Sequence, residues 1–133
     1  MEKSIDQKKP PRYLSKISRE TFDKLKEQIL HVLVVEKKYR DRTFNAKKLA
    51  ELLHTNTRYV SIVLSVRYHV NYTTFINRLR IEEAMALLVD KRYAELRIEE
   101  ISDMVGFSNR QSFYRAFCVH TGKTPRQYQQ TFE

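Results

Sequence analysis

The sequence predicts an all-α fold, and three observations support this prediction. The chain of 133 residues has the length of one domain with a tail. It contains only two glycines, and no proline lies between positions 12 and 124, which disfavours β-hairpins because their tight turns need residues at positive φ. Apolar side chains recur at steps of three and four residues, as they do on one face of a helix. We therefore expect about seven helices.

The charge balance predicts a polyanionic partner. The chain carries 25 Lys+Arg against 16 Asp+Glu, a net charge of +9. A single cysteine excludes an intramolecular disulfide, and the four histidines are scattered, so no metal site, cofactor site or catalytic constellation emerges. No apolar run approaches the ~18 residues of a membrane span. We expect a cytoplasmic binding protein that is not an enzyme.

The N-terminal part of the chain divides into a tail and one helix. Residues 1–16 are polar, basic and interrupted by two prolines, which predicts a flexible tail whose cations are either solvated or touch phosphate. The segment 17–43 has helical periodicity from Ser18, which can cap the helix, to Tyr39. This spacing predicts a first helix of about twenty residues.

Residues 44–70 contain two short helices and the turn between them. Asn45 can cap the first helix, and Asn56 can cap the second, which runs from Thr57 to Arg67. Two short helices joined by a turn of about three to four residues form a helix-turn-helix unit. Leucines on one face of the first helix should supply its core contacts: Leu49, Leu52 and Leu53.

The rest of the chain contains a long helix and a repeat of the first unit. Within 71–90, an amphipathic stretch predicts one linker helix of about seventeen residues. Within 97–133, a short helix ends at Gly106, Ser108 can cap the next helix, and Thr124 followed by proline opens the last one. The two halves therefore repeat one helix-turn-helix pattern.

The second unit carries a family signature. The segments that carry it are Ile98-Glu-Glu-Ile101, Val105-Gly106-Phe107-Ser108, Ser112-Phe113-Tyr-Arg115-Ala-Phe117 and Thr121-Gly122-Lys-Thr124-Pro125-Arg126-Gln-Tyr128. Together with Phe75-Ile76 and Leu79-Arg80-Ile81 of the linker helix, they resemble the AraC/XylS family of transcription regulators, and the resemblance covers roughly residues 44 to 130.

This resemblance implies a fold and a function. It implies two homeodomain-like helix-turn-helix subdomains joined by a linker helix, each inserting one recognition helix into successive major grooves of double-stranded DNA. RNA polymerase would be a further partner of an activator, and a sensor domain of a longer protein could be missing. The alternative is a regulator-derived adaptor that binds a protein and has weak or no specific affinity for DNA.

The resemblance also implies which side chains read bases. In the first recognition helix Ile62 either contacts a thymine methyl or packs inside the protein, and in the second Gln111 either reads a base or forms a capping box with Ser108. Arg110 and Arg115 contact bases, contact phosphate or stay solvated. The complete set of base-reading candidates is Arg58, Ser61, Ile62, Arg110, Gln111, Tyr114 and Arg115.

Phosphate contacts are expected from helix N-termini and nearby cations, because free amides and positive charge both favour an anion. Arg80 is expected to tie the two subdomains together by pairing with Glu83 or Asp103. His69 stands where the family often has glycine, so the turn there could be altered. The phosphate candidates are Asn45, Lys47, Lys48, Asn56, Thr57, Arg78, Ser108, Asn109, Thr124 and Arg126.

Overall fold

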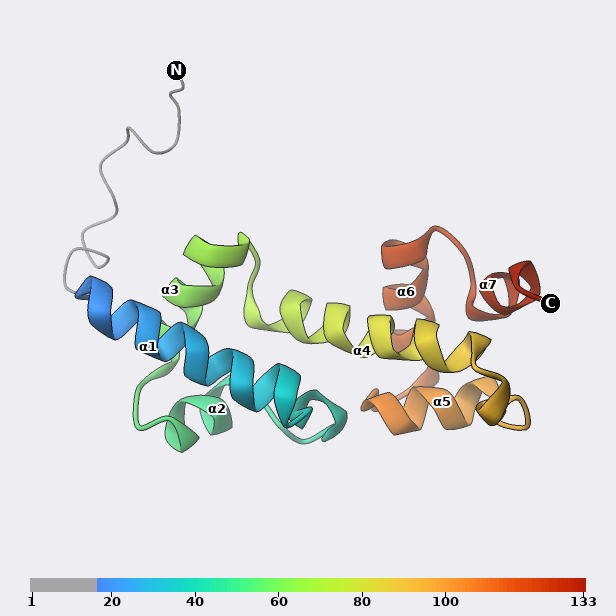
Figure 1. The fold of residues 1–133 in the computed structure, drawn as a ribbon, viewed down its shortest axis with the longest axis horizontal. Helices are drawn as coiled ribbons and strands as arrows, with labels where there is room; N and C mark the ends of the chain where they lie inside the picture. Colours follow the sequence, from blue (N-terminus) through green and yellow to red (C-terminus); the bar gives the residue numbers. More distant parts are fainter. Residues whose placement is uncertain (1–16) are drawn as a thin grey trace, which may run out of the picture.

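The computed structural model describes residues 17–133, and the tail predicted for 1–16 lies outside the described residues. The described part is all helical, as the sequence predicts: it contains seven α-helices and no strand (Figure 1). The α-helices are α1 (Arg19–Leu30), α2 (Ala46–Leu52), α3 (Thr57–Tyr68), α4 (Tyr72–Val89), α5 (Ile98–Val105), α6 (Arg110–Thr121) and α7 (Pro125–Thr131).

The first helix ends earlier than its periodicity predicts. After α1 the chain forms a π-helical turn, η3 (His31–Val35), and then Lys37 adopts a left-handed conformation with φ of 56°. A 3-10 turn, η4 (Lys38–Arg40), follows. The prediction of one helix that reaches Tyr39 is therefore wrong. The left-handed residue redirects the backbone and buries Tyr39, which is only 6% exposed.

Side-chain caps start the helices of both units. The amide oxygen of Asn45 accepts a hydrogen bond from the backbone N–H of Lys48 at the start of α2. The side chain of Asn56 accepts the corresponding bond from the backbone N–H of Tyr59 at the start of α3. Thr124 forms a capping box with Gln127 at the start of α7. Each cap satisfies an amide that the helix itself leaves free. These caps confirm the helix starts that the sequence predicts at 45, 56 and 124.

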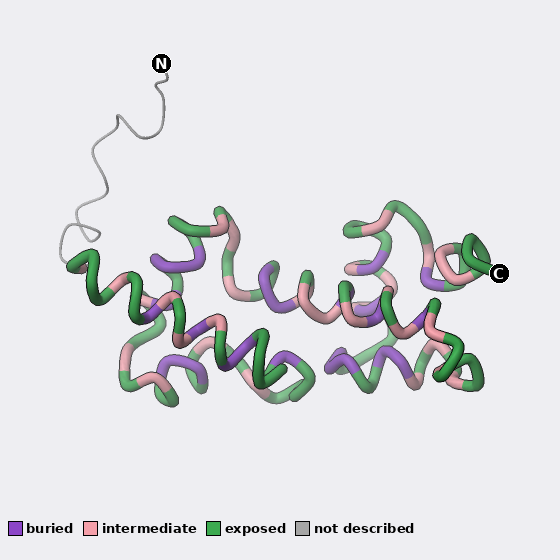
Figure 2. Tube along the Cα trace, viewed as in Figure 1, coloured by how far each residue is buried: buried purple, intermediate pink, exposed green. Residues whose placement is uncertain are grey.

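Two hydrophobic cores share the linker helix α4 (Figure 2). The first core joins α1, α2, α3 and the start of α4, where Phe75 and Ile76 are buried. The second joins α5 and α6 to the remainder of α4, where Ile81, Ala84 and Leu88 are buried, with α7 packed against it. Because one continuous helix of 18 residues enters both cores, the spacing between the two units is fixed by a rigid element.

The recognition helices α3 and α6 lie on the same side of α4 in Figure 1. Each packs against α4, and α3 also packs against α1 and α2. One apolar position of the first unit differs from the prediction. Leu52 is 49% exposed, so it does not share the buried face of Leu49.

Candidate nucleic-acid interface

The first recognition helix exposes polar side chains near its start. Arg58 and Ser61 are exposed, as is Thr57. Ile62, by contrast, is only 3% exposed. Of the two roles that the sequence leaves open for Ile62, this burial favours packing inside the protein over contact with a thymine methyl. Ile62 is therefore a packing residue, and Arg58 and Ser61 remain as base-reading candidates on this helix.

The second recognition helix is capped one residue later than predicted. The side chain of Asn109, and not that of Ser108, accepts the backbone N–H of Ser112 at 2.8 Å. Of the two roles left open for Gln111, the capping box with Ser108 is therefore not formed. The exposed Gln111 side chain has no capping role there, so it is free to reach a ligand.

Two arginines project from the exposed face of α6 in different environments. Arg110 lies 3.8 Å from a carboxylate oxygen of Glu99, and its guanidinium stacks over the ring of Tyr114 at 5.6 Å. These contacts restrict its rotamers, and Tyr114 itself is half-buried. Arg115 is exposed and lines a hollow against α4.

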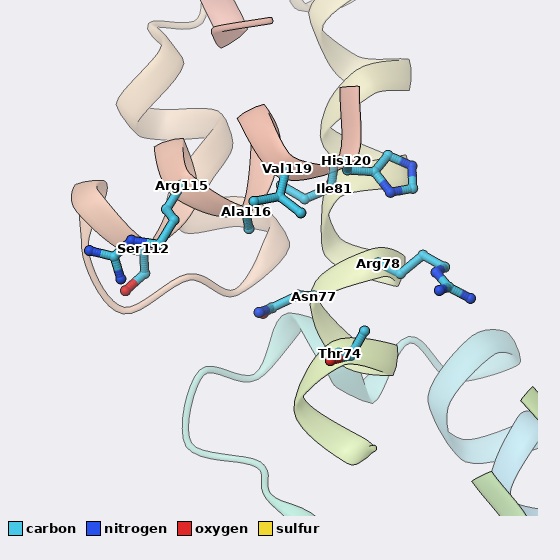
Figure 3. Close-up of a pocket in the computed structure, with 9 residues that line it drawn as sticks. All are labelled: Thr74, Asn77, Arg78, Ile81, Ser112, Arg115, Ala116, Val119 and His120. Carbon is cyan, nitrogen blue, oxygen red and sulfur yellow. The ribbon is translucent and has the colours of Figure 1, made fainter. Parts of the chain in front are cut away.

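Three hollows follow α4 from one recognition helix to the other, and together we call them the α4 groove. The hollow beside α3 has a volume of about 430 Å³, the middle one about 460 Å³, and the one beside α6 about 480 Å³. Neighbouring hollows share lining residues, Tyr72 and Thr73 at one junction and Asn77 at the other. Figure 3 shows the third hollow, where Asn77 projects from α4 toward the side of α6 that carries Ser112 and Arg115.

Several phosphate candidates lie at or near this groove. Asn45 and Lys47 line the middle hollow, Thr57 lines the one beside α3, and Arg78 lines the one beside α6. The other candidates are exposed or partly exposed at helix starts: Lys48 on α2, Asn56 before α3, Ser108 and Asn109 before α6, and Thr124 and Arg126 at α7.

Three polar residues of α4 that line the groove are not among the candidates predicted from the sequence. Thr73 and Thr74 are exposed and Asn77 is half-buried, and all three lie along the hollows. A signal for them exists in the sequence. Once Phe75 and Ile76 are assigned to the core, helical spacing places 73, 74 and 77 on other faces of the same helix.

Arg80 joins the two units, but by backbone contacts and not by the predicted ion pair. Its Nε donates to the backbone carbonyl of Tyr39 at 2.7 Å, and its guanidinium lies 5.6 Å from the ring centre of Phe107. Tyr39 precedes the first unit and Phe107 lies in the turn of the second. The prediction of Glu83 or Asp103 as its partner is wrong, because both carboxylates are engaged by other arginines.

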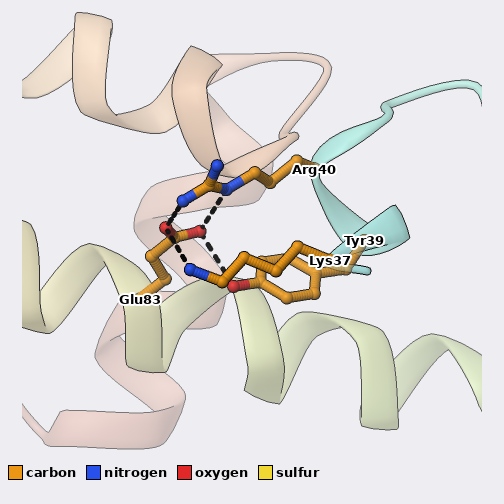
Figure 4. A network of polar contacts seen from close by, with 4 residues as sticks. All are labelled: Lys37, Tyr39, Arg40 and Glu83. Atoms are coloured by element: carbon orange, nitrogen blue, oxygen red, sulfur yellow. Dashed lines mark hydrogen bonds and ion pairs between the residues drawn. The ribbon is translucent and has the colours of Figure 1, made fainter. Parts of the chain in front are cut away.

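Glu83 holds the segment before the first unit against α4 (Figure 4). Its carboxylate accepts hydrogen bonds from Tyr39 Oη at 2.9 Å and Arg40 Nε at 2.9 Å, and Arg40 Nη2 forms a second bond. Lys37 Nζ lies 4.0 Å away. Burial alone would raise the pKa of Glu83, but the bonds from Arg40 and Tyr39 hold that pKa below its ordinary value. Burial, together with the neighbouring carboxylate, raises the pKa of Tyr39 to about 12.

The turn of the second unit packs directly on this segment. Gly106 has φ of +108°, and a Cβ built there would meet the carbonyl oxygen of Tyr39 and lie 2.9 Å from the carbonyl carbon and oxygen of Arg40. On the neighbouring surface Arg42 pairs with Asp103 of α5 at 3.6 Å. The segment 37–42, which we call the strap, therefore contacts α4 and the second unit together.

The turn after α3 keeps the left-handed conformation that a glycine would adopt. His69 caps α3 with φ of 60° and ψ of 34°, and its N–H donates to the carbonyl of Ser65 at 3.0 Å. The histidine therefore tolerates this conformation, and α4 begins three residues later. The altered turn expected from the sequence is absent.

Within residues 17–133, no helix has the length and apolar character that a membrane crossing requires. The same residues contain no group of three or more His, Cys, Asp or Glu side chains placed to hold a metal ion.

The chain has two helix-turn-helix units on one linker helix, and their polar recognition helices lie on the same side of it. This arrangement is that of a double helix-turn-helix protein. A family model described as a helix-turn-helix domain matches residues 49–131. The chain therefore belongs to the AraC-type helix-turn-helix family of transcription regulators. This confirms the family that the signature in the second unit indicates.

Curated relatives of this family are longer proteins. The chain is 34% identical over 85 residues to the HTH-type transcriptional regulator YobQ of Bacillus subtilis, and this match covers 64% of this chain and 34% of YobQ. It is 37% identical over 70 residues to the transcriptional activator AggR of Escherichia coli, which covers 50% of this chain and 25% of AggR. The chain thus spans about a third or less of the length of these relatives.

Solved structures agree with the fold. The C-terminal domain of the response regulator yesN from Fusobacterium nucleatum is 28% identical, with a TM-score of 0.66, and the match covers 77% of this chain and 97% of that domain. The C-terminal domain of AraT from Geobacillus stearothermophilus is 24% identical, with a TM-score of 0.68, and covers 87% of this chain and 88% of its own length.

Proposed function

We propose that this chain binds double-stranded DNA in a sequence-specific manner, regulates transcription and acts by binding, without catalysis, in the cytoplasm. The observation that carries the proposal is the placement of α3 and α6 on the same side of α4, each with exposed polar side chains. Membership of the AraC-type family supports it.

The length of α4 sets the geometry of the proposed complex. Its 18 residues span about 27 Å at 1.5 Å per residue. Successive major grooves on one face of B-DNA are ~34 Å apart. A rigid pair of recognition helices presented closer than this distance favours DNA that bends toward the protein.

Base reading is assigned to the exposed residues of the two recognition helices. On α3, Arg58 can donate bidentately to a guanine edge, and Ser61 can donate or accept a single hydrogen bond. On α6, Gln111 matches an adenine edge and Arg115 matches a guanine edge. Arg110 is a further candidate whose contacts with Glu99 and Tyr114 must adjust to reach a base.

Phosphate contacts at both units would fix the register of the protein on the duplex. The free amides at the starts of α3 and α6 would favour a phosphate oxygen, and exposed cations on α2 and α4 would add to this attraction. Such contacts supply affinity without sequence information. We assign this role to the phosphate candidates named above.

Two partners besides DNA follow from the relatives. AggR and CfaD of Escherichia coli are named as transcriptional activators, so we propose RNA polymerase as a partner if this chain activates. Because the curated relatives are about three times as long or longer, we also propose that the regulator acts together with a sensor domain.

The test is selection of bound duplexes from a random DNA pool at about 150 mM salt, where non-specific affinity is weak. The proposal predicts one asymmetric motif with two blocks about ten base pairs apart. Arg58→Ala should relax one block and Arg115→Ala the other. Absence of any enriched motif would contradict the proposal and favour the adaptor that binds a protein instead.

A further inference from the structure

The two helix-turn-helix units meet on α4 at a short stretch between their cores. The first core buries Phe75 and Ile76 of this helix, and the second core begins with Ile81. Roughly 7 Å of helix, a little more than one turn, separates the two sets of buried side chains. Helices in proteins are rarely straight, and they bend where their packing permits it. The orientation of one unit relative to the other therefore depends on what else connects the units at this stretch.

The strap provides a second connection between the units, and Figure 4 shows where it contacts α4. Tyr39 and Arg40 both donate to the carboxylate of Glu83, which lies beyond the start of the second core. In the opposite direction, Arg80 Nε donates to the backbone carbonyl of Tyr39 at 2.7 Å. The ring of Tyr39 is buried in the first core. The strap therefore connects the first core to the middle of α4.

The strap also contacts the second unit outside α4. The backbone of Gly106 packs so closely on the strap that an added Cβ would lie 2.9 Å from the carbonyl carbon and oxygen of Arg40. A second contact is the ion pair of Arg42 with Asp103 on α5, at 3.6 Å. The first core, α4 and the second unit are thus connected to one another in three places. Such an arrangement resists bending of α4, because a bend would have to break the contacts of the strap.

We infer that the strap sets the orientation of α3 relative to α6, and thereby the spacing of the two DNA blocks that the protein accepts. The positioning residues are Arg40 and Arg42 on the strap and Glu83 on α4. In Figure 1 the strap and α5 lie on the opposite side of α4 from the two recognition helices. The orientation is a property of the protein alone, whereas its effect on spacing rests on the proposed function and adds to it.

Small bends of α4 are large on the scale of base recognition. A bend of about 10° at the middle of the helix moves a side chain about 13 Å away by roughly 2 Å. A hydrogen bond tolerates a change of only about half an ångström in the distance between donor and acceptor. A protein whose α4 bends freely could adjust to blocks at several separations. A protein whose α4 is supported by the strap should accept one separation.

The test compares the wild type with variants that release the strap. The first strap variant is Arg40→Ala with Arg42→Ala, whose side chains are 45% and 47% exposed, so the protein should still fold. The second is Glu83→Ala, which removes the contacts of the strap from the side of α4. The matched control is Arg92→Ala with Arg97→Ala, because these arginines pair with carboxylates only two or three positions away. Urea unfolding checks that each protein is folded.

The first measurement is the distance between one spin label on each recognition helix, obtained by pulsed electron paramagnetic resonance without DNA. Cys118, the single cysteine of the chain, is exposed on α6, and Ser65→Cys adds an exposed label site on α3. The otherwise wild-type protein and the control should each give one narrow distance distribution. In both strap variants the distribution should shift or broaden by about 2 Å or more.

The second measurement is the affinity for duplexes whose two selected blocks lie one base pair closer together or farther apart. One base pair changes the separation by about 3.4 Å and turns one block by roughly 35°. The wild type and the control should prefer the selected spacing by at least about tenfold, which is the effect of losing one bidentate base contact. The strap variants should lose most of this preference, while their affinity for a single block stays that of the control.

The two measurements separate this inference from the proposed function. Wild-type distance distributions in both strap variants would overturn the inference and leave the proposed function intact. A spacing preference that stays sharp in both strap variants would overturn it as well. A wild type that selects no DNA motif would instead remove the proposed function, and the distance measurement would then decide by itself whether the strap orients the recognition helices.

Discussion

The close approach of Gly106 to the strap makes a sharp prediction about stability. Gly106→Ala introduces a Cβ at φ of +108° that meets the carbonyl oxygen of Tyr39 and lies 2.9 Å from two backbone atoms of Arg40. The left-handed backbone costs an L-residue about 1–2 kcal/mol. The contact adds about 1–3 kcal/mol, because backbone atoms must shift. We expect a loss of about 2–4 kcal/mol after a small gain from the stiffer unfolded chain.

Gly122→Ala is the matched control for this prediction. Gly122 also has positive φ, +78°, but a Cβ there meets nothing within 4 Å. Its loss should stay near 1 kcal/mol, which is the conformational cost alone. Urea unfolding followed by circular dichroism measures both changes, with the midpoint moving and the slope constant. Equal losses in the two variants would refute the packing of the strap on the second unit.

Four further predictions test the caps, the core, the strap and base reading. Asn109→Ala should cost about 1 kcal/mol of stability, whereas Ser108→Ala should cost little, as judged by denaturant midpoints. Phe117→Ala should cost about 3–5 kcal/mol because its ring is fully buried, and an unshifted melting temperature would contradict the second core. Glu83→Gln should cost about 1–3 kcal/mol of stability at neutral pH. The folded-state pKa of Glu83 is lowered, so the stability that its carboxylate contributes is present above the ordinary pKa of 4.5 and is lost as pH falls through the folded-state pKa. The stabilities of the wild type and the variant should therefore converge in acid. Arg115→Ala should weaken binding to the selected site by about 1–3 kcal/mol and relax one base position, and an equal loss on every duplex would assign it to phosphate.

Local features of the fold could be predicted from the sequence because they depend on neighbours in the chain. The caps at Asn45, Asn56 and Thr124 each involve residues only three positions apart. The two helix boundaries at Gly106 and Gly122 follow from the conformational freedom of glycine at positive φ. Periodicity then predicts the linker helix, because apolar residues at helical spacing indicate a helix whatever element packs against it.

Long-range features could not be predicted in the same way. The bonds from Tyr39 and Arg40 to Glu83 join residues more than 40 positions apart, and no periodic pattern encodes such a pairing. The left-handed conformation of Lys37 ends the first helical segment and is linked to the burial of Tyr39, which is a tertiary contact. Periodicity alone also leaves the role of Ile62 open, because it does not reveal that α3 packs against α1, α2 and α4 together.

The sequence predicts which helices carry the candidate site, but it does not predict the shape of the surface between them. Arg58, Ser61, Arg110, Gln111 and Arg115 are exposed on the two recognition helices where the family pattern places them. The groove between those helices could not be predicted because it is formed by the relative placement of α3, α4 and α6. That placement depends on the shared linker helix and on the strap, which are tertiary features.

In the proposed complex, one chain holds two recognition helices at a fixed separation and reads two DNA blocks together. The most direct test measures the affinity of the wild type for the selected duplex while base pairs are inserted between the blocks. Insertion of about five base pairs turns one block to the opposite face of the helix, so we expect affinity to fall to that of a single block. Insertion of about ten base pairs should not restore the affinity, because the separation of the two recognition helices is fixed. Affinity that does not change with the insertions would show that only one helix reads DNA and would refute joint reading of two blocks.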